Sequence, residues 1–273
     1  MMSFKIGFGA EEDREEGKAP ETTLAQTVQT PIRKSVVNVH FPDRHQTYTY
    51  YNDMFDLNRG DIVYVDGQLE GFRGLVVEVN YNFKIRLSDY KRVIGVADTN
   101  VAGRFHMAGS YIVTDDETAL KYDQVVTWFK APKTQEEEYV SSGGDEVFNL
   151  NDLSSMKAKS AIVERGYQYY TEDRVVYIEL SHGKGRALVT GGETYDVEFF
   201  YDQEEIRNLV CSCYCCGICK HEFATMLQLK DILAAVKKEY PLIEHNHYLS
   251  AVSKSTFFEF AIDNKTKGIF AIQ

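Results

Sequence analysis

All five cysteines of this 273-residue chain lie in one stretch, Cys211-Ser-Cys213-Tyr-Cys-Cys-Gly-Ile-Cys219-Lys-His221. Disulfides stabilise a fold mainly by joining residues that are far apart in the chain. Cysteines packed this closely along the sequence therefore have little value as cross-links, and a secreted disulfide framework would spread them out. In a reducing compartment, the remaining explanation for the stretch is a bound metal ion.

The spacing of the thiol and imidazole groups predicts a structural zinc site. Cys211 and Cys213 form a C-x-C pair, and after five further residues Cys219 and His221 form a C-x-H pair. Structural Zn²⁺ sites prefer four tetrahedral ligands, commonly thiolates and imidazoles. The first pair follows a predicted strand at 206–210, and the second pair begins a predicted helix. We therefore predict that these four residues bind one Zn²⁺ ion in a ββα unit.

Other kinds of site fit the stretch less well. An iron–sulfur cluster usually has four cysteines at a different spacing and would not need the histidine. A thiol redox switch is conceivable because Cys215 and Cys216 are left over, although adjacent cysteines rarely form an unstrained disulfide. A catalytic zinc keeps one position open, and Glu222, the one base candidate nearby, is expected to point outward. The sequence leaves open whether Cys215 or Cys216 replaces a predicted ligand.

The elements around the stretch predict a helix and a meander of strands. Apolar residues recur at helical spacing over 156–170, and a second amphipathic helix over 221–236 is ended by Pro241. Between the two helices, β-branched and aromatic runs are separated by tight turns. These runs predict four strands, at 175–180, 186–189, 195–200 and 206–210.

The N-terminal half shows period-2 alternation, which is typical of strands. Its runs are rich in valine, isoleucine and tyrosine, with Asn-Arg-Gly-Asp and Asp-Gly turns between them. Several short strands at this spacing favour a small antiparallel barrel or a strongly bent sheet. The predicted strands are 36–39, 48–51, 61–65, 74–79, 83–87, 111–114 and 125–129.

Together these patterns predict an α+β protein. It would have a small antiparallel β-barrel-like N-terminal domain and a C-terminal helix–β-sheet domain ending in the zinc-bound ββα unit. The segment 131–150 is rich in Pro, Glu, Ser and Gly, as linkers are. The predicted division is a flexible N-terminal arm at 1–30, a β-rich domain at 31–130, a linker at 131–150, a zinc-finger domain at 151–240 and a C-terminal extension at 241–273.

Composition and charge limit the classes of function. The net charge is −11, and only the part after residue 205 holds slightly more basic than acidic residues, which disfavours non-specific coating of nucleic acid. No apolar run approaches 18 residues, and the N-terminus turns acidic early, so we expect a cytoplasmic protein without a membrane partner. No nucleotide-binding glycine loop or nucleophile elbow is present.

The cysteine stretch resembles the SWIM-type zinc finger, whose pattern is C-x-C, a variable loop and C-x-H. Here the pattern is continued by Glu-Phe-Ala-Thr-Met-Leu after His221. Upstream, Arg165-Gly-Tyr-Gln-Tyr-Tyr170 and Ala187-Leu-Val189 are similar to the lead-in of bacterial SWIM proteins, so the likeness covers about 156–236. The resemblance implies a structural zinc ion and a role in binding DNA or protein partners. The loop between the ligand pairs is shorter than is common in this family.

A weaker resemblance concerns residues 35–95. The segments Asp56-Leu-Asn-Arg-Gly-Asp-Ile-Val-Tyr-Val65 and Gly74-Leu-Val-Val-Glu-Val79 are similar to the N-terminal DNA-binding domain of the primosomal replication-restart helicase. Many small barrels share this pattern, and acidic residues slightly outnumber basic ones over 31–130. The likeness therefore transfers no DNA-binding site.

The sequence predicts a non-enzymatic zinc-finger module that mediates protein–protein interaction. An unidentified protein partner is favoured because the chain is acidic. The alternative is a nucleic-acid-binding accessory factor, and a zinc hydrolase is the least supported function. In the alternative, the phosphate-contacting residues would be Lys220, Arg207, Lys230, Lys237 and Lys238.

Overall fold

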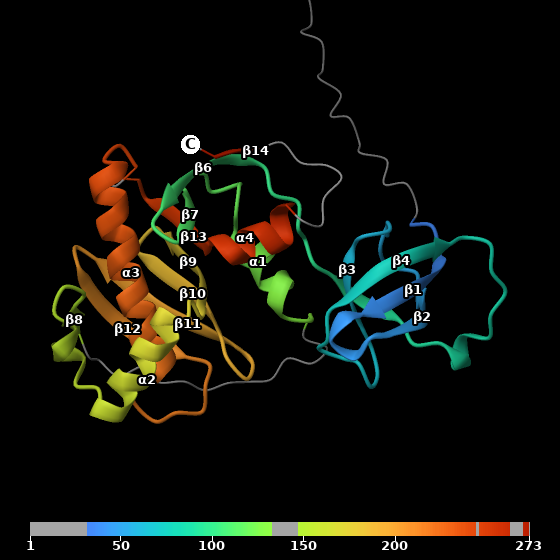
Figure 1. Ribbon diagram of the computed structural model, residues 1–273, viewed down its shortest axis with the longest axis horizontal. Helices are drawn as coiled ribbons and strands as arrows, with labels where there is room; N and C mark the ends of the chain where they lie inside the picture. The colour runs from blue at the N-terminus through green and yellow to red at the C-terminus, as the bar shows by residue number, and fades with distance from the viewer. Residues whose placement is uncertain (1–31, 133–146, 244–245, 263–269, 273) are drawn as a thin grey trace, which may run out of the picture. The chain divides into compact units, whose positions relative to one another are not determined.

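The computed structural model describes residues 32–132, 147–243, 246–262 and 270–272. The predicted N-terminal arm and most of the predicted linker lie outside these residues. Within them, the chain forms two β-sheets and a few helices, an α+β arrangement (Figure 1). No helix of the described part has both the length and the apolar character needed to cross a membrane.

The first sheet has five antiparallel strands in the order β2-β1-β4-β3-β5. Buried and half-exposed residues alternate strictly along β1, which is why the period-2 pattern predicted it. The side chains on the buried face of the sheet, most of them valines, pack together into a separate hydrophobic core. The strands are β1 (Ser35–Phe41), β2 (Gln46–Asn52), β3 (Ile62–Val65), β4 (Gly74–Asn80) and β5 (Val93–Val96).

This sheet does not close into the predicted barrel. Among the described residues, its edge strands β2 and β5 form no ladder with each other, and an isolated bridge pairs Tyr51 only with Arg92, the residue before β5. The predicted strand at 83–87 is wrong as well. Exposed and half-buried residues do alternate there, but the backbone pairs with no strand of the described chain and runs into a short 3₁₀ helix, Leu87–Asp89. Alternation alone cannot supply a hydrogen-bonding neighbour.

The second sheet has nine strands in the order β14-β6-β7-β13-β9-β10-β11-β12-β8. All pairs are antiparallel except the edge pair β14–β6. Strands on both sides of the predicted linker share this sheet, because β13 pairs with β7 on one side and β9 on the other. The strands are β6 (Gly103–Ala108), β7 (Tyr111–Thr114), β8 (Phe148–Asn149), β9 (Val175–Ser181), β10 (Lys184–Thr190), β11 (Thr194–Asp202), β12 (Glu205–Cys211), β13 (Tyr248–Ser253) and β14 (Phe270–Ile272).

The four predicted strands of the C-terminal half are confirmed as the meander β9 to β12. His182 and Gly183 join β9 to β10 with φ angles of 50° and 80°. Gln203 and Glu204 join β11 to β12 with φ angles of 47° and 73°. Positive φ at both turn residues matches the twist of the flanking strands, so each pair forms a two-residue hairpin.

Helices cover both faces of the nine-stranded sheet. Ile178 and Ala187 point into a core that they share with α2 and α3. Their sequence neighbours Tyr177 and Leu188 point to the opposite face, into a core shared with α1 and α4. In Figure 1, α2 and α3 lie side by side over the first of these faces. The helices are α1 (Tyr122–Phe129), α2 (Ser160–Thr171), α3 (Lys220–Glu239) and α4 (Lys254–Phe257).

The predicted strand at 125–129 is wrong, because this segment belongs to helix α1. Its β-branched residues favour a strand, but Val125 and Trp128 lie three residues apart and are both buried on one helical face. The Trp128 indole N–H also donates to the carbonyl oxygen of Asp98 over 2.6 Å. Tertiary burial therefore overrides the local preference.

The two helices that flank the meander differ slightly from their predicted bounds. α2 begins at Ser160 rather than at 156, because Lys157 has a φ of 52° and separates it from a 3₁₀ turn. α3 ends at Glu239, as the proline two residues later predicts. The helices approach closely at Gly166, where a Cβ atom would lie 2.7 Å from the ring of Phe223.

Candidate metal centre

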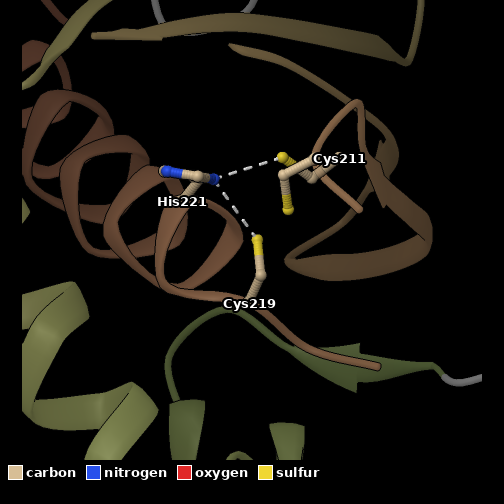
Figure 2. Close-up of side chains that lie close together, drawn as sticks. Cys211, Cys219 and His221 are labelled. Carbon is tan, nitrogen blue, oxygen red and sulfur yellow. Dashed lines mark hydrogen bonds between the residues drawn. The ribbon is translucent and has the colours of Figure 1, made fainter. Parts of the chain in front are cut away.

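The four predicted ligand residues lie together where β12 meets α3. Their donor atoms, from Cys211, Cys213, Cys219 and His221, all lie within 4.8 Å of one another, so the group could hold a metal ion. We call it the Cys3His cluster. Cys211 ends β12, whereas Cys219 and His221 flank the first residue of α3. Figure 2 shows the imidazole of His221 pointing at the sulfur atoms of Cys211 and Cys219.

The distances within the cluster fit a tetrahedral zinc site. The Nδ1 atom of His221 lies 3.5 Å from the sulfur of Cys211 and 3.8 Å from that of Cys219. Zinc–sulfur bonds of about 2.3 Å and zinc–nitrogen bonds of about 2.0–2.1 Å at the tetrahedral angle place sulfur and nitrogen about 3.6 Å apart. The two nitrogen–sulfur separations thus match those of one shared ion, with Nδ1 as the imidazole donor, and the remaining donor pairs lie within 4.8 Å.

Burial separates the four cluster members from the two remaining thiols. Cys219 is 1% exposed and His221 is 3% exposed, while the other two cluster cysteines are half-buried. Cys215 and Cys216 are exposed and lie outside the cluster. The structure therefore brings together the predicted set and leaves these two cysteines out of it.

Cys219 also begins helix α3 as its N-cap. Its sulfur accepts a hydrogen bond from the Glu222 backbone N–H over 3.4 Å, and the Glu222 carboxylate accepts one from the Cys219 N–H over 2.7 Å. This is a capping box in which cysteine replaces the usual serine or threonine. The expectation that Glu222 points outward is wrong: it is 5% exposed and folded back onto the helix start.

Two tyrosines enclose the imidazole of His221. The ring of Tyr195, from β11, stacks on it with the ring centres 4.1 Å apart, and Tyr169, from α2, meets it edge-on at 5.3 Å. The Lys220 ammonium lies 4.3 Å from the centre of the Tyr169 ring. The buried Nε2 atom of His221 has no hydrogen-bond partner among the described residues. The orientation of the imidazole is therefore set by its contacts with the two tyrosine rings.

The pKa values around the cluster have the pattern expected of a site that needs a cation. Burial raises the pKa of Cys213 to about 12, with the nearby Cys219 thiol adding to the shift. The hydrogen bond with Cys211, together with burial, raises the pKa of Cys219. Burial lowers the pKa of His221 to about 4, with Lys220 adding to the shift, so the imidazole is neutral, as metal binding requires. Only a bound cation would stabilise several thiolates this close together.

Backbone pairing holds the segment between the first two ligands. Ser212 and Asp196 exchange hydrogen bonds: the Ser212 N–H donates to the Asp196 carbonyl over 2.9 Å, and the Asp196 N–H donates to the Ser212 hydroxyl over 3.0 Å. The Asp196 carboxylate is itself bonded by the Tyr122 hydroxyl and the Lys130 ammonium. Ser212 therefore anchors the loop to β11.

Sequence reasoning missed the supporting residues of the cluster. Tyr169 and Tyr195 enclose His221, but nothing local in the sequence ties them to a histidine that follows them by tens of residues. The N-cap of α3 could have been predicted from the sequence, because Cys219 and Glu222 have the N-cap to N3 spacing of a capping box.

The basic residues suggested for phosphate binding do not gather at the cluster. Lys220 lies beside it, over Tyr169. Arg207, Lys230 and Lys237 instead line a surface pocket of about 1250 Å³ that none of the four cluster residues lines. Arg207 is paired with Glu205 at 2.7 Å. The positive charges are thus divided between two places.

The chain was also compared with known proteins. No family model, no curated protein and no solved structure matches it. The geometry of the Cys3His cluster is therefore what the functional argument rests on.

Proposed function

We propose that the chain binds one Zn²⁺ ion through the Cys3His cluster and that the ion has a structural role. The observation that carries the proposal is the set of four soft donors within 4.8 Å at the junction of a strand and a helix. Zinc suits three thiolates and one imidazole better than calcium or magnesium, which prefer oxygen ligands. In this proposal the module is of the SWIM type, in a reducing, cytoplasmic setting that keeps the thiols available.

A structural role is favoured over a catalytic one. Four protein donors fill a tetrahedral shell and leave no position for a reacting water. Glu222, the nearest carboxylate, is engaged in the capping box and buried. A hydrolase at this site would lack both an open metal position and a free general base.

The proposed role of the module is to bind a protein partner through the loop that the metal closes. The ligand loop, residues 212–218, presents Tyr214 with 91% of its side chain exposed. Tyrosine is among the residues that dominate the affinity of protein interfaces. The net charge of −11 favours a protein over nucleic acid.

The proposal is tested first by metal analysis. Purified reduced protein should contain one zinc per chain, and its cobalt-substituted form should give the spectrum of a tetrahedral site with three sulfur ligands. Absence of metal, or a spectrum with fewer sulfurs and an exchangeable water, would exclude the structural site.

The partner is tested separately, by capture with wild type and with Tyr214→Ala. A partner that binds the wild type and is lost with the variant supports the interface, provided that zinc content is unchanged. Equal recovery of every partner with both proteins would contradict it.

A nucleic-acid-binding role is the second candidate. It is favoured by Lys220, which lies beside the Cys3His cluster, and by the basic residues Arg207, Lys230 and Lys237 that line the surface pocket. Phosphate contacts predict an affinity that falls steeply as the salt concentration rises. Titration of single- and double-stranded DNA at low and physiological salt tests this role, and lack of binding at low salt excludes it.

A further inference from the structure

The ligand loop contains two thiols that the proposed metal centre does not use. Cys215 and Cys216 are exposed, whereas the four members of the Cys3His cluster are buried or half-buried. Dissolved oxidants therefore reach these two sulfurs before they reach the ligands.

The spacing of the loop distinguishes Cys216 from Cys215. Cys216 stands three residues after Cys213 and three before Cys219, so it forms a C-x-x-C pair with a ligand in either direction. Disulfides need Cα atoms about 4.4–6.8 Å apart. Adjacent residues, such as Cys215 and Cys216, are held at about 3.8 Å, which is too close.

The backbone of the loop folds around the sulfur of Cys213. The Cys215 backbone N–H faces that sulfur and lowers the pKa of Cys213, against the larger effect of burial. The backbone bends at 212–214 and again at 216–218, which brings Cys213 and Cys216 closer together than an extended chain would. Gly217 has a φ of 78°, and a Cβ atom there would meet nothing within 4 Å, so the residue directly after Cys216 has open space around it.

Cys213 is the more accessible of the two possible partners. It is half-buried and lies in the loop, whereas Cys219 is 1% exposed and held in the capping box of α3. A bond from Cys216 to Cys213 leaves the start of the helix in place.

We propose that Cys216 is an oxidation site that forms a disulfide with the metal ligand Cys213 and thereby releases the metal ion. This inference rests on the metal centre proposed above. The oxidant is a hydroperoxide. The device makes metal occupancy, and with it the shape of the ligand loop, respond to oxidation.

The reaction proceeds in two balanced steps. The Cys216 sulfur attacks the hydroperoxide, the O–O bond breaks, Cys216 becomes a sulfenic acid and the peroxide leaves as an alcohol, or as water from hydrogen peroxide. The Cys213 thiolate then attacks the sulfenic sulfur, the S–S bond forms, and the hydroxyl group leaves as water after taking a proton from solvent. Two sulfurs lose two electrons, and the peroxide gains them.

Loss of Cys213 leaves three protein donors for the ion. A structural zinc site holds its metal through four ligands, and removal of one weakens binding. A thiol reductant restores both sulfurs, so the metal rebinds once the oxidant is removed.

The test treats the zinc-loaded full chain with hydrogen peroxide and follows zinc release with a chromogenic indicator. Peptide mapping without reduction should locate a disulfide between Cys213 and Cys216, and dithiothreitol should reverse the release. With Cys216→Ser, release should slow by about tenfold or more, because the sulfur that forms the disulfide is missing. The matched control, Cys215→Ser, should behave as wild type.

Each outcome decides one of the two proposals. Zinc release from Cys216→Ser at the wild-type rate, or a disulfide that maps to Cys215, overturns the oxidation site. A reduced protein without zinc overturns the metal centre, and the disulfide map still decides on Cys216. With Cys213→Ser, a sulfenic acid trapped by dimedone at Cys216 supports the assignment, and its absence contradicts it.

Discussion

The five-stranded sheet has an apolar core of its own, whereas the ligand loop between β12 and α3 has almost none. Val37, Val39, Val63 and Val76 are fully buried within the sheet. Most of the ligand loop is exposed, and its one large aromatic side chain projects into solvent. Burial of apolar surface stabilises the first region, whereas the second has the Ser212 hydrogen bonds at one end, Ile218 at the other and, in the proposed function, metal ligation.

The difference teaches that ordering the backbone, which costs conformational entropy, can be offset in two different ways within one chain. Fixing each residue costs about 1–2 kcal/mol. The sheet recovers this cost by packing valines, and in the proposed zinc-bound state the short ligand loop would recover most of it through coordination. The two regions should therefore respond differently to the same perturbations.

The largest expected effect is that of removing a ligand. Cys219→Ser should abolish stoichiometric zinc binding and disorder the start of α3, because structural zinc sites contribute about 10–16 kcal/mol of coupled binding and folding free energy. Zinc content and hydrogen exchange of α3 would be measured. The five-stranded sheet should keep its exchange protection, and equal loss of protection in the sheet would break the comparison.

Acidification should produce the next largest effect, and only at the cluster. Cys213 and Cys219 have raised pKa values, so both hold protons at neutral pH that the metal must displace. Each proton displaced from a ligand thiol makes affinity rise about tenfold per pH unit, so these two alone give at least about a hundredfold rise per unit. His221, with its pKa lowered to about 4, contributes no proton between pH 6 and 8. Zinc affinity that stays flat over this range would contradict the assignment.

The converse perturbation is Val63→Ala in the five-stranded sheet. Val63 is fully buried, so the lost methyl groups and the resulting cavity should lower the free energy of unfolding by about 2 kcal/mol. Zinc affinity should stay at the wild-type value, as measured by competition with a chelating indicator. Chemical denaturation measures the stability, and a weakened zinc site in this variant would show that the two regions are coupled.

The smallest expected effect concerns the tyrosine stacked on His221. Tyr195→Leu removes the ring that fixes the imidazole and should weaken zinc binding by about tenfold, which is the low end for groups that orient a ligand. Tyr195→Phe keeps the ring and serves as the matched control, with affinity near wild type. Similar losses in both variants would assign the effect to the hydroxyl group instead of to stacking.

Sequence patterns predicted the parts of the fold that depend on near neighbours. The meander β9 to β12 and helix α3 follow from alternation, two-residue turns and a terminating proline, all of which act within a few residues. The four residues of the Cys3His cluster could be predicted for the same reason, because they lie within eleven consecutive positions. The segments 83–87 and 125–129 were assigned wrongly because their local preference was outweighed by pairing and burial elsewhere.

By itself, the sequence determined which side chains can share a metal ion, because thiols and an imidazole at C-x-C and C-x-H spacing can meet after one turn of the backbone. It also determined the strands and the helix that carry them. Only the tertiary structure decided that β13 lies between β7 and β9, that Tyr169 and Tyr195 enclose His221, and that the first sheet stays open. Those outcomes depend on contacts between residues far apart in the chain, whose pairing no local pattern encodes.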